Sequence, residues 1–247
     1  MPSPRLLLFL DSRSPAGAHS HSQGVEVAVG QGLIVDLPTL TDYCRGRLRT
    51  AGAVSAAFAA TSAQAFLDGA DAVQWLAIDT ELEARTPSAA TRVASRALGK
   101  GLRRLLKATA STEEWGEVER AWPLLAAPHQ PLVLGAGCAM LGGSPDLAAR
   151  AAALSVCSAA SSAAIRLLGL DPYAAHRMVA DLEADITTLC REVTSLLSLY
   201  RAEYGGIAKT SVWLESEYLA RLCSNSAPAV EILADVHARE EMRLFAS

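Results

Sequence analysis

Aromatic residues are scarce in this chain of 247 residues. Phe, Trp and Tyr make up 5% of the sequence, although hydrophobic residues make up 51%. Alanine therefore carries much of the apolar content, and alanine is the strongest helix former and lets helices approach closely. The composition favours an α-helical protein with a core built from small side chains.

The sequence also lacks an excess of positive charge and a long apolar run. Its net charge is −4, which argues against a nucleic-acid partner, because such proteins carry clustered positive charge. The basic segment Lys100–Lys107 is interpreted as the solvated face of a helix. No segment reaches the ~20 consecutive apolar residues of a membrane span, and Asp11 and Arg13 interrupt the short apolar opening before it could serve as a secretory signal. We expect a cytoplasmic protein that binds neither membrane nor nucleic acid.

Paired cysteine spacings are absent as well. The five cysteines are far apart and none forms a C-x-x-C pair, the pattern expected of a zinc site or a disulfide framework. They are interpreted as buried thiols that act as small hydrophobic residues.

Sequence motifs for catalysis are missing too. Gly135-Ala136-Gly137 and Leu98-Gly99-Lys100-Gly101 are only fragments of phosphate-binding loops. Spacing alone suggests no Ser-His-Asp or Cys-His constellation. Asp181 and Asp185 lie one helical turn apart and could hold a cation, but they flank an apolar seam and are interpreted as a solvated pair. We therefore expect neither an enzyme nor a resident cofactor or metal.

Helical periodicity covers most of what remains. Asp171-Pro172 begins a helix with an apolar seam that runs from Met178 to Tyr200 and predicts one long element over 172–204. An Ala- and Ser-rich helix over 147–168 is expected to present Leu154, Cys157 and Ala160 on one buried stripe. Further helices are predicted over 36–50, 54–67, 72–84, 88–108, 112–122, 131–141, 211–223 and 228–244. The valine alternation in 24–30 suggests a strand, but a lone strand would have no partner, so a helix is preferred. These patterns predict one all-α domain over 1–247, a bundle of roughly ten helices.

Two histidines close to the N-terminus could indicate a metal site. His19 and His21 stand in Ala16-Gly17-Ala18-His19-Ser20-His21-Ser22-Gln23-Gly24-Val25-Glu26. Residues at i and i+2 point to opposite sides of a helix, and Ser20 with Gln23 fits a capping box that would start one. A scaffold role is preferred, and a stand-alone nickel- or zinc-binding protein that uses His19 and His21 is the alternative.

The C-terminus is unusual because it is not polar. The chain ends in Arg243-Leu244-Phe245-Ala246-Ser247, whereas most chains end in a frayed polar tail. Arginine and large apolar side chains supply binding hot spots, so segment 228–247 is either an ordinary amphipathic helix or an anchor for a partner.

Several segments together resemble the UreF family of urease accessory proteins. They are Leu8-Phe9-Leu10-Asp11-Ser12, the Pro15–Glu26 segment, Glu81-Leu82-Glu83-Ala84-Arg85-Thr86, Ser162-Ala163-Ala164-Ile165-Arg166-Leu167 and the terminal Arg243–Ser247. Ser20, Ser22, Gly24 and Glu26 fall on the family's Ser-x-Ser-x-Gly-x-Glu positions. The terminal pattern is matched by Arg243, Leu244, Phe245 and Ser247, with His237 on the preceding histidine. Arg166 takes the place of a basic residue, although Leu167–Pro172 departs from the Pro-Leu-Gly-Gln segment that usually follows.

The resemblance implies a helical scaffold and no catalysis. Members of this family form homodimers, bind a UreD/UreH-type accessory protein and recruit the GTPase UreG, and the complex delivers Ni²⁺ to apo-urease. On this resemblance the C-terminal end would anchor in the UreD/UreH-type partner. The Ser20–Glu26 segment and Arg166 would contribute to the surface for dimerisation and GTPase contact.

Overall fold

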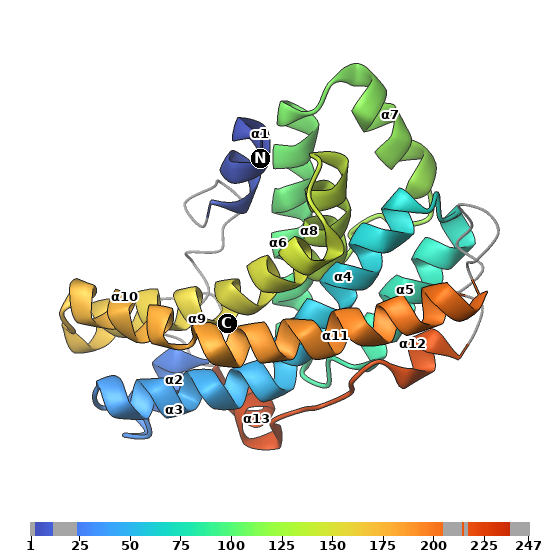
Figure 1. Cartoon of the computed structure of the whole chain (residues 1–247). Coiled ribbons are helices and arrows are strands. Elements are labelled where there is room, and N and C mark those ends of the chain that lie inside the picture. The colour runs from blue at the N-terminus through green and yellow to red at the C-terminus, as the bar shows by residue number, and fades with distance from the viewer. Residues whose placement is uncertain (1–2, 12–23, 205–213, 215–216, 238–247) are drawn as a thin grey trace.

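The protein is all-α, as predicted. A computed structural model describes residues 3–11, 24–204, 214 and 217–237, and the described part of the chain consists of helices and their connections (Figure 1). The elements are α1 (Pro4–Leu10), α2 (Val25–Gly30), α3 (Leu37–Arg47), η2 (Leu48–Gly52), α4 (Ala53–Leu67), α5 (Ala72–Ala84), α6 (Ala89–Thr109), α7 (Thr112–Ala121), α8 (Gln130–Met140), α9 (Pro145–Leu168), α10 (Pro172–Asp181), α11 (Glu183–Tyr204), α12 (Tyr218–Arg221) and α13 (Pro228–His237).

Short polar side chains define where the helices begin. Asp36 caps α3 and exchanges hydrogen bonds with Thr39, while Asp71 and Gln74 do the same at α5. Ser144 and Asp171 cap α9 and α10, and a proline follows each of them. Each cap satisfies backbone N–H groups that have no partner within the helix. These signals are local, which is why the sequence predicts the start of these helices well.

Helices α4 and α8 form the centre of the core. Both are buried on nearly all sides, and α9 packs against both of them. At their contact a Cβ atom on Gly135 would lie 2.2 Å from the carbonyl oxygen of Ala59. The two backbones therefore touch, which only a residue without a side chain permits.

The predicted helix over 172–204 is in fact two helices. α10 ends at Asp181 and α11 begins at Glu183, with the 1%-exposed Leu182 in the turn between them. The turn keeps Leu182 in the core while the two helices follow different neighbours, α10 packing on α3 and α9, and α11 on α4 and α9. The apolar seam itself is confirmed, because Met178, Ile186 and Val193 are buried.

Other segment predictions fare differently. Residues 25–30 are helical, so the helix preferred over the strand is confirmed. The stripe predicted on α9 is wrong at Leu154, which is 46% exposed, and right at Cys157 and Ala160. In the described parts of 211–223 and 228–244, α-helix covers only Tyr218–Arg221 and Pro228–His237. In the basic segment of α6, Leu102 is buried and Lys100, Arg104 and Lys107 are exposed, as predicted, whereas Arg103 is half-buried and donates to the Leu125 carbonyl.

One helix of the described residues has the length and composition of a membrane span. An 18-residue window of α9 meets that test, but 44% of the window is buried inside the structure. α9 also contacts α4, α8 and α11. A core helix rich in alanine passes the same test, and the packing of α9 fits that explanation.

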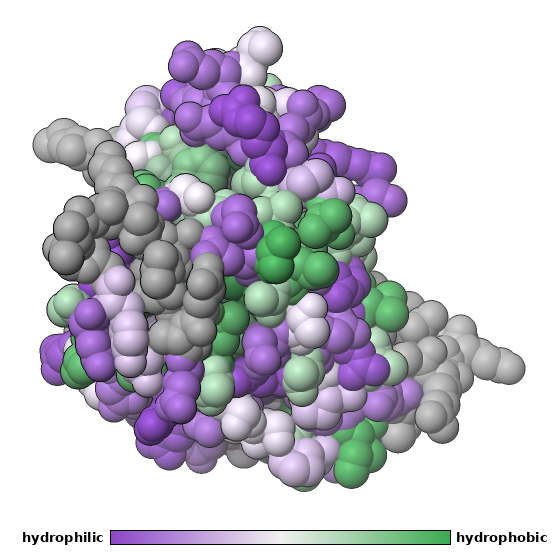
Figure 2. All heavy atoms as spheres, turned by 90° about the vertical axis from the view of Figure 1, so that its right-hand side faces the viewer, coloured by the Kyte–Doolittle hydropathy of each residue, from purple (hydrophilic) through white to green (hydrophobic). Residues whose placement is uncertain are grey.

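The outer surface differs between regions of the molecule. On the side that lies at the right of Figure 1, hydrophobic side chains gather among hydrophilic ones, while the end formed by α7 is strongly hydrophilic (Figure 2). Where α4 ends and α5 begins, Leu67, Val73 and Leu76 are 45%, 68% and 41% exposed.

The α4–α8 contact leads to a test of stability. Gly135→Ala should lower the free energy of unfolding by about 2 kcal/mol or more, because the new methyl group pushes two packed backbones apart. Gly46→Ala is the matched control, since a Cβ at this exposed helical position meets no atom within 4 Å. The control should be neutral or stabilising by up to about 1 kcal/mol. Equal stabilities in urea denaturation would contradict the close contact.

Candidate functional site

The C-terminal helix α13 is held at the N-terminus of α6 by two carboxylates. The backbone N–H of Ser88 donates to Glu231 Oε2 at 3.2 Å. Asp235 Oδ1 accepts from Ser88 Oγ at 2.6 Å and from the Ala90 N–H at 3.1 Å. Glu231 and Asp235 lie one turn apart on α13, so both reach the start of α6, where carboxylates are favoured by the helix dipole. We call Ser88, Glu231 and Asp235 the α13 clamp.

Gly24, which precedes α2, lies against the same helix. Its φ of +83° lies in the left-handed region, which favours glycine. A Cβ there would lie 2.9 Å from Tyr43 Oη and 3.5 Å from Val230 Cγ1 of α13. The segment that begins α2 and the last described helix of the chain therefore meet in space, although some 200 residues separate them.

The structure describes only part of the predicted partner surface. Glu26 lies in the first turn of α2 and is half-buried. α2 packs against α9, which carries the exposed Arg166 in its last turn. His237 is the last residue of α13. Gly24, Glu26 and Arg166 thus belong to neighbouring helices.

The remaining predicted residues lie outside the described residues. They are His19, Ser20, His21, Ser22, Arg243, Leu244, Phe245 and Ser247. The helix start predicted at Ser20 lies there too, and the helix that the structure describes begins at Val25.

A small cavity lies beside this junction. Its volume is about 100 Å³, and α13 contributes Val230 and Glu231 to its wall. The opposite walls include Arg85, Ser95 and Gln130. One member of the α13 clamp, Glu231, therefore also forms part of the cavity wall.

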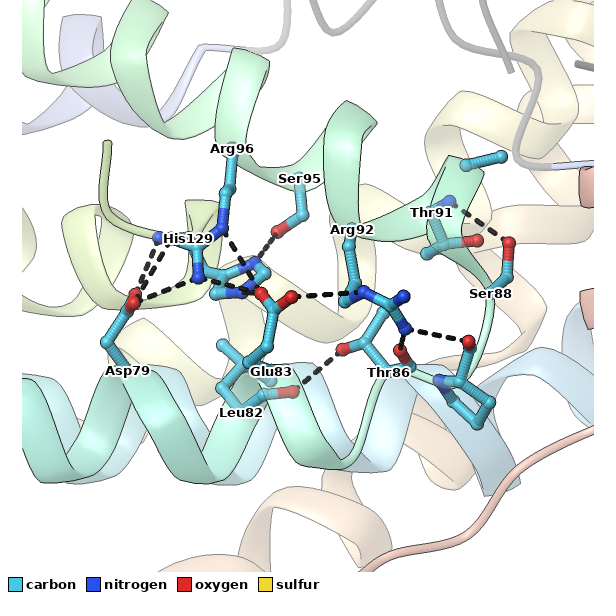
Figure 3. Close-up of polar contacts among 12 residues, drawn as sticks. Asp79, Leu82, Glu83, Thr86, Ser88, Thr91, Arg92, Ser95, Arg96 and His129 are labelled. Carbon is cyan, nitrogen blue, oxygen red and sulfur yellow. Dashed lines mark hydrogen bonds and ion pairs between the residues drawn. The ribbon is translucent and has the colours of Figure 1, made fainter. Parts of the chain in front are cut away.

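A buried polar network lies on the far side of Ser95 (Figure 3). His129 is the residue just before α8, at its N-cap position, and is 0% exposed. Its backbone N–H donates to Asp79 Oδ1 at 3.1 Å, its Nε2 lies 2.7 Å from Glu83 Oε2, and its Nδ1 lies 3.0 Å from Ser95 Oγ. The network joins α5, α6 and the start of α8.

Two arginines of α6 neutralise the carboxylates of this network. Arg96 contacts Asp79 Oδ2 with both terminal nitrogens at 3.1 Å and Glu83 Oε2 at 2.7 Å. Arg92 Nε lies 3.0 Å from Glu83 Oε1. The buried Asp79 in particular needs such a partner, because an unpaired charge in the protein interior is strongly unfavourable.

The network fixes the protonation of its members. Burial acts to raise the pKa of Glu83, but hydrogen bonds from Arg96 and His129 outweigh it and hold that pKa below its usual value. Burial lowers the pKa of His129 in spite of the nearby Asp79 carboxylate. Glu83 is therefore ionised and His129 neutral at physiological pH. Since an ionised carboxylate only accepts hydrogen bonds, Nε2 carries the proton and Nδ1 accepts from Ser95 Oγ.

Sequence reasoning missed this network. Glu83 stands in the Glu81–Thr86 segment that resembles the family, but His129 carried no local signal beyond its place before Gln130-Pro131. The partners of His129 are 34 to 50 residues away in sequence, so only the packing of α8 reveals them.

The candidate metal ligands do not come together in the described residues. Asp181 pairs with Arg177 and Asp185 with Arg45, all on the surface, so the predicted solvated pair is confirmed. Cys44, Cys138, Cys157 and Cys190 are buried free thiols and Cys223 is half-buried. The described part of the chain contains no group of three or more His, Cys, Asp or Glu side chains that could hold a metal ion.

These features define a helical protein whose described polar clusters hold helices together and in which Gly24, at the start of α2, lies against α13. The sequence model of the UreF family matches residues 34–183. The urease accessory protein UreF of Mycolicibacterium vanbaalenii is 36% identical over 242 residues, which cover 98% of this chain and 97% of the relative. The protein of that name from Mycobacterium marinum is 35% identical over 245 residues, with the same coverage. This chain belongs to the UreF family of urease accessory proteins.

The state of His129 predicts how stability depends on pH. Its pKa in the folded protein lies below the unfolded value of 6.5, so the unfolded state binds more protons as the pH falls below that value. The free energy of unfolding should therefore fall between about pH 7.5 and about pH 5.5, and less so in His129→Gln. Urea denaturation at both pH values measures this. His176→Gln, at an exposed position, is the control and should show the wild-type fall in the free energy of unfolding. The same fall in His129→Gln would contradict the lowered pKa of His129.

Proposed function

We propose that this chain is a non-catalytic scaffold for urease maturation. It binds a UreD/UreH-type accessory protein and the GTPase UreG, and the complex delivers Ni²⁺ to apo-urease in the cytoplasm. The observation that carries this proposal is the similarity to proteins named urease accessory protein UreF over nearly the whole chain. Nickel is the cargo of this process and is not a resident cofactor of this chain.

The two ends of the chain have separate roles in the proposal. The C-terminal segment, with His237, Arg243, Leu244, Phe245 and Ser247, anchors in the UreD/UreH-type protein. Ser20, Ser22, Gly24, Glu26 and Arg166 contribute to homodimerisation and to the contact with UreG. The packing of α2 against α9 and α13 is consistent with this proposal, because it places Gly24 and Glu26 beside the helix that ends at His237.

Co-expression tests the scaffold role. Full-length protein should co-purify with UreD-type and UreG-type proteins. Removal of residues 243–247 should weaken UreD-type binding by about 30-fold or more, because an interface hot spot typically contributes ~2 kcal/mol or more. Failure of the full chain to retain either partner would refute the scaffold, and retention by the truncated chain would refute the anchor. A stoichiometric metal that disappears in His19→Ala or His21→Ala would instead favour the nickel- or zinc-binding alternative.

The α13 clamp should position the C-terminal anchor. Asp235→Asn should speed amide hydrogen exchange in α13 and weaken UreD-type binding by about tenfold, since hydrogen bonds to charged groups contribute ~1.5–3 kcal/mol. Asp181→Asn is the matched control, because Asp181 pairs only with a neighbouring residue of the exposed face of α10. Faster amide exchange in α13 together with an unchanged affinity for the UreD-type protein would show that the clamp orders α13 but does not contribute to partner binding.

A further inference from the structure

Ser95 is the one member of the His129 network that also lines the cavity. Its half-buried side chain lies on α6, on the cavity wall beside Gln130. Its Oγ lies 3.0 Å from His129 Nδ1 and accepts a hydrogen bond from the Gln130 N–H at 3.2 Å. Side chains of serines within helices often bond to a carbonyl of the preceding turn, whereas this hydroxyl faces a ring nitrogen.

The protonation pattern around Ser95 is that of an activated hydroxyl. Glu83 Oε2 lies 2.7 Å from His129 Nε2, and because the ionised carboxylate only accepts hydrogen bonds, Nε2 carries the ring proton. The lone pair of Nδ1 is therefore directed at Ser95 Oγ. A nucleophile, a neutral base and a carboxylate that orients the base therefore lie in hydrogen-bonding sequence (Figure 3). This is the geometric requirement for nucleophilic attack assisted by a general base.

We propose that Ser95 is a covalent acceptor site for small activated acyl groups. The Ser95 oxygen attacks the carbonyl carbon of an acyl ester and its proton moves to His129 Nδ1. The bond between the carbonyl carbon and the leaving oxygen then breaks, and the proton on His129 passes to the departing group. The product is an ester on Ser95, and no oxidant or reductant is needed.

The charges that face the imidazole ring bear on this proton transfer. From α5, the carboxylates of Asp79 and Glu83 stabilise the transient imidazolium, and from α6 the guanidinium of Arg96 opposes it. Arg92 contacts Glu83 and limits the charge that this carboxylate presents. Burial outweighs these carboxylates and holds the pKa of His129 below its usual value, so the ring readily releases the proton that it has taken up.

The cavity determines the size of the acyl group. Its volume of about 100 Å³ is enough for a small acyl group such as acetyl, since a cavity needs only about 10–15 Å³ of such volume to hold one water molecule. The class of ligand is therefore a short-chain activated ester.

Ser155 is an internal control for this reaction. It lines the same cavity, but its Oγ donates to the carbonyl of Ala152 at 2.8 Å. A reagent that enters the cavity can reach Ser95, Ser155 and also Ser55, and of the two serines compared only Ser95 lies against a base. A difference in their rates therefore measures activation by His129 and not access alone.

The experiment is acetylation of the full-length protein by 4-nitrophenyl acetate, followed by peptide mapping with mass spectrometry. Acetylation of Ser95 should be about 100-fold faster than that of Ser155, the lower end of what a general base contributes. His129→Gln and Ser95→Ala should abolish the fast release of 4-nitrophenolate, with folding checked by circular dichroism. Equal labelling of Ser95 and Ser155 in the wild-type protein would overturn the proposal even if His129→Gln did not fold. Undiminished labelling of Ser95 in a folded His129→Gln protein would also overturn it. The reaction needs no partner protein, so its outcome is independent of the scaffold proposal.

Discussion

The close packing of α8 is the constraint on which the rest of the structure depends. Gly135 allows α8 to touch the backbone of α4, and a Cβ on Gly99 of α6 would lie 2.0 Å from the carbonyl oxygen of Pro128, just before α8. Helix α8 is thus held between two neighbours at contact distance. Because such contacts depend on small residues, the low aromatic and high alanine content of the chain follows from the fold.

This packing also creates the polar network. Because α8 packs in the core, its N-cap residue His129 is fully buried. The backbone N–H and the ring nitrogens of His129 therefore need hydrogen-bond partners inside the protein. Asp79, Glu83 and Ser95 supply them, and Arg96 balances the carboxylates. The same arrangement orders α5 against α6, and the start of α6 holds α13. The close packing of α8 is therefore linked, through the His129 network and α6, to the position of α13.

Local signals in the sequence predicted the helices and their caps, because Asp36, Ser144 and Asp171 act within one turn of their own position. The break at Leu182 was not predictable, since Leu182 continues the apolar period and only the different neighbours of α10 and α11 require the turn. The position of Gly24 against Val230 and the triad of Glu83, His129 and Ser95 depend on contacts between distant segments. Such contacts depend on how distant segments pack together, and the residue pattern within one segment does not predict this. The resemblance to the UreF family supplied the functional interpretation, and the comparison over the full chain confirmed the family.

The most direct test of the scaffold account is the nickel content of urease made with and without this chain. Urease would be expressed with its UreD-type and UreG-type proteins, then purified, and its nickel per active site determined. The account predicts nearly full nickel occupancy and activity when this chain is present and a large loss of both when it is absent. Equal nickel content in the two preparations would contradict it.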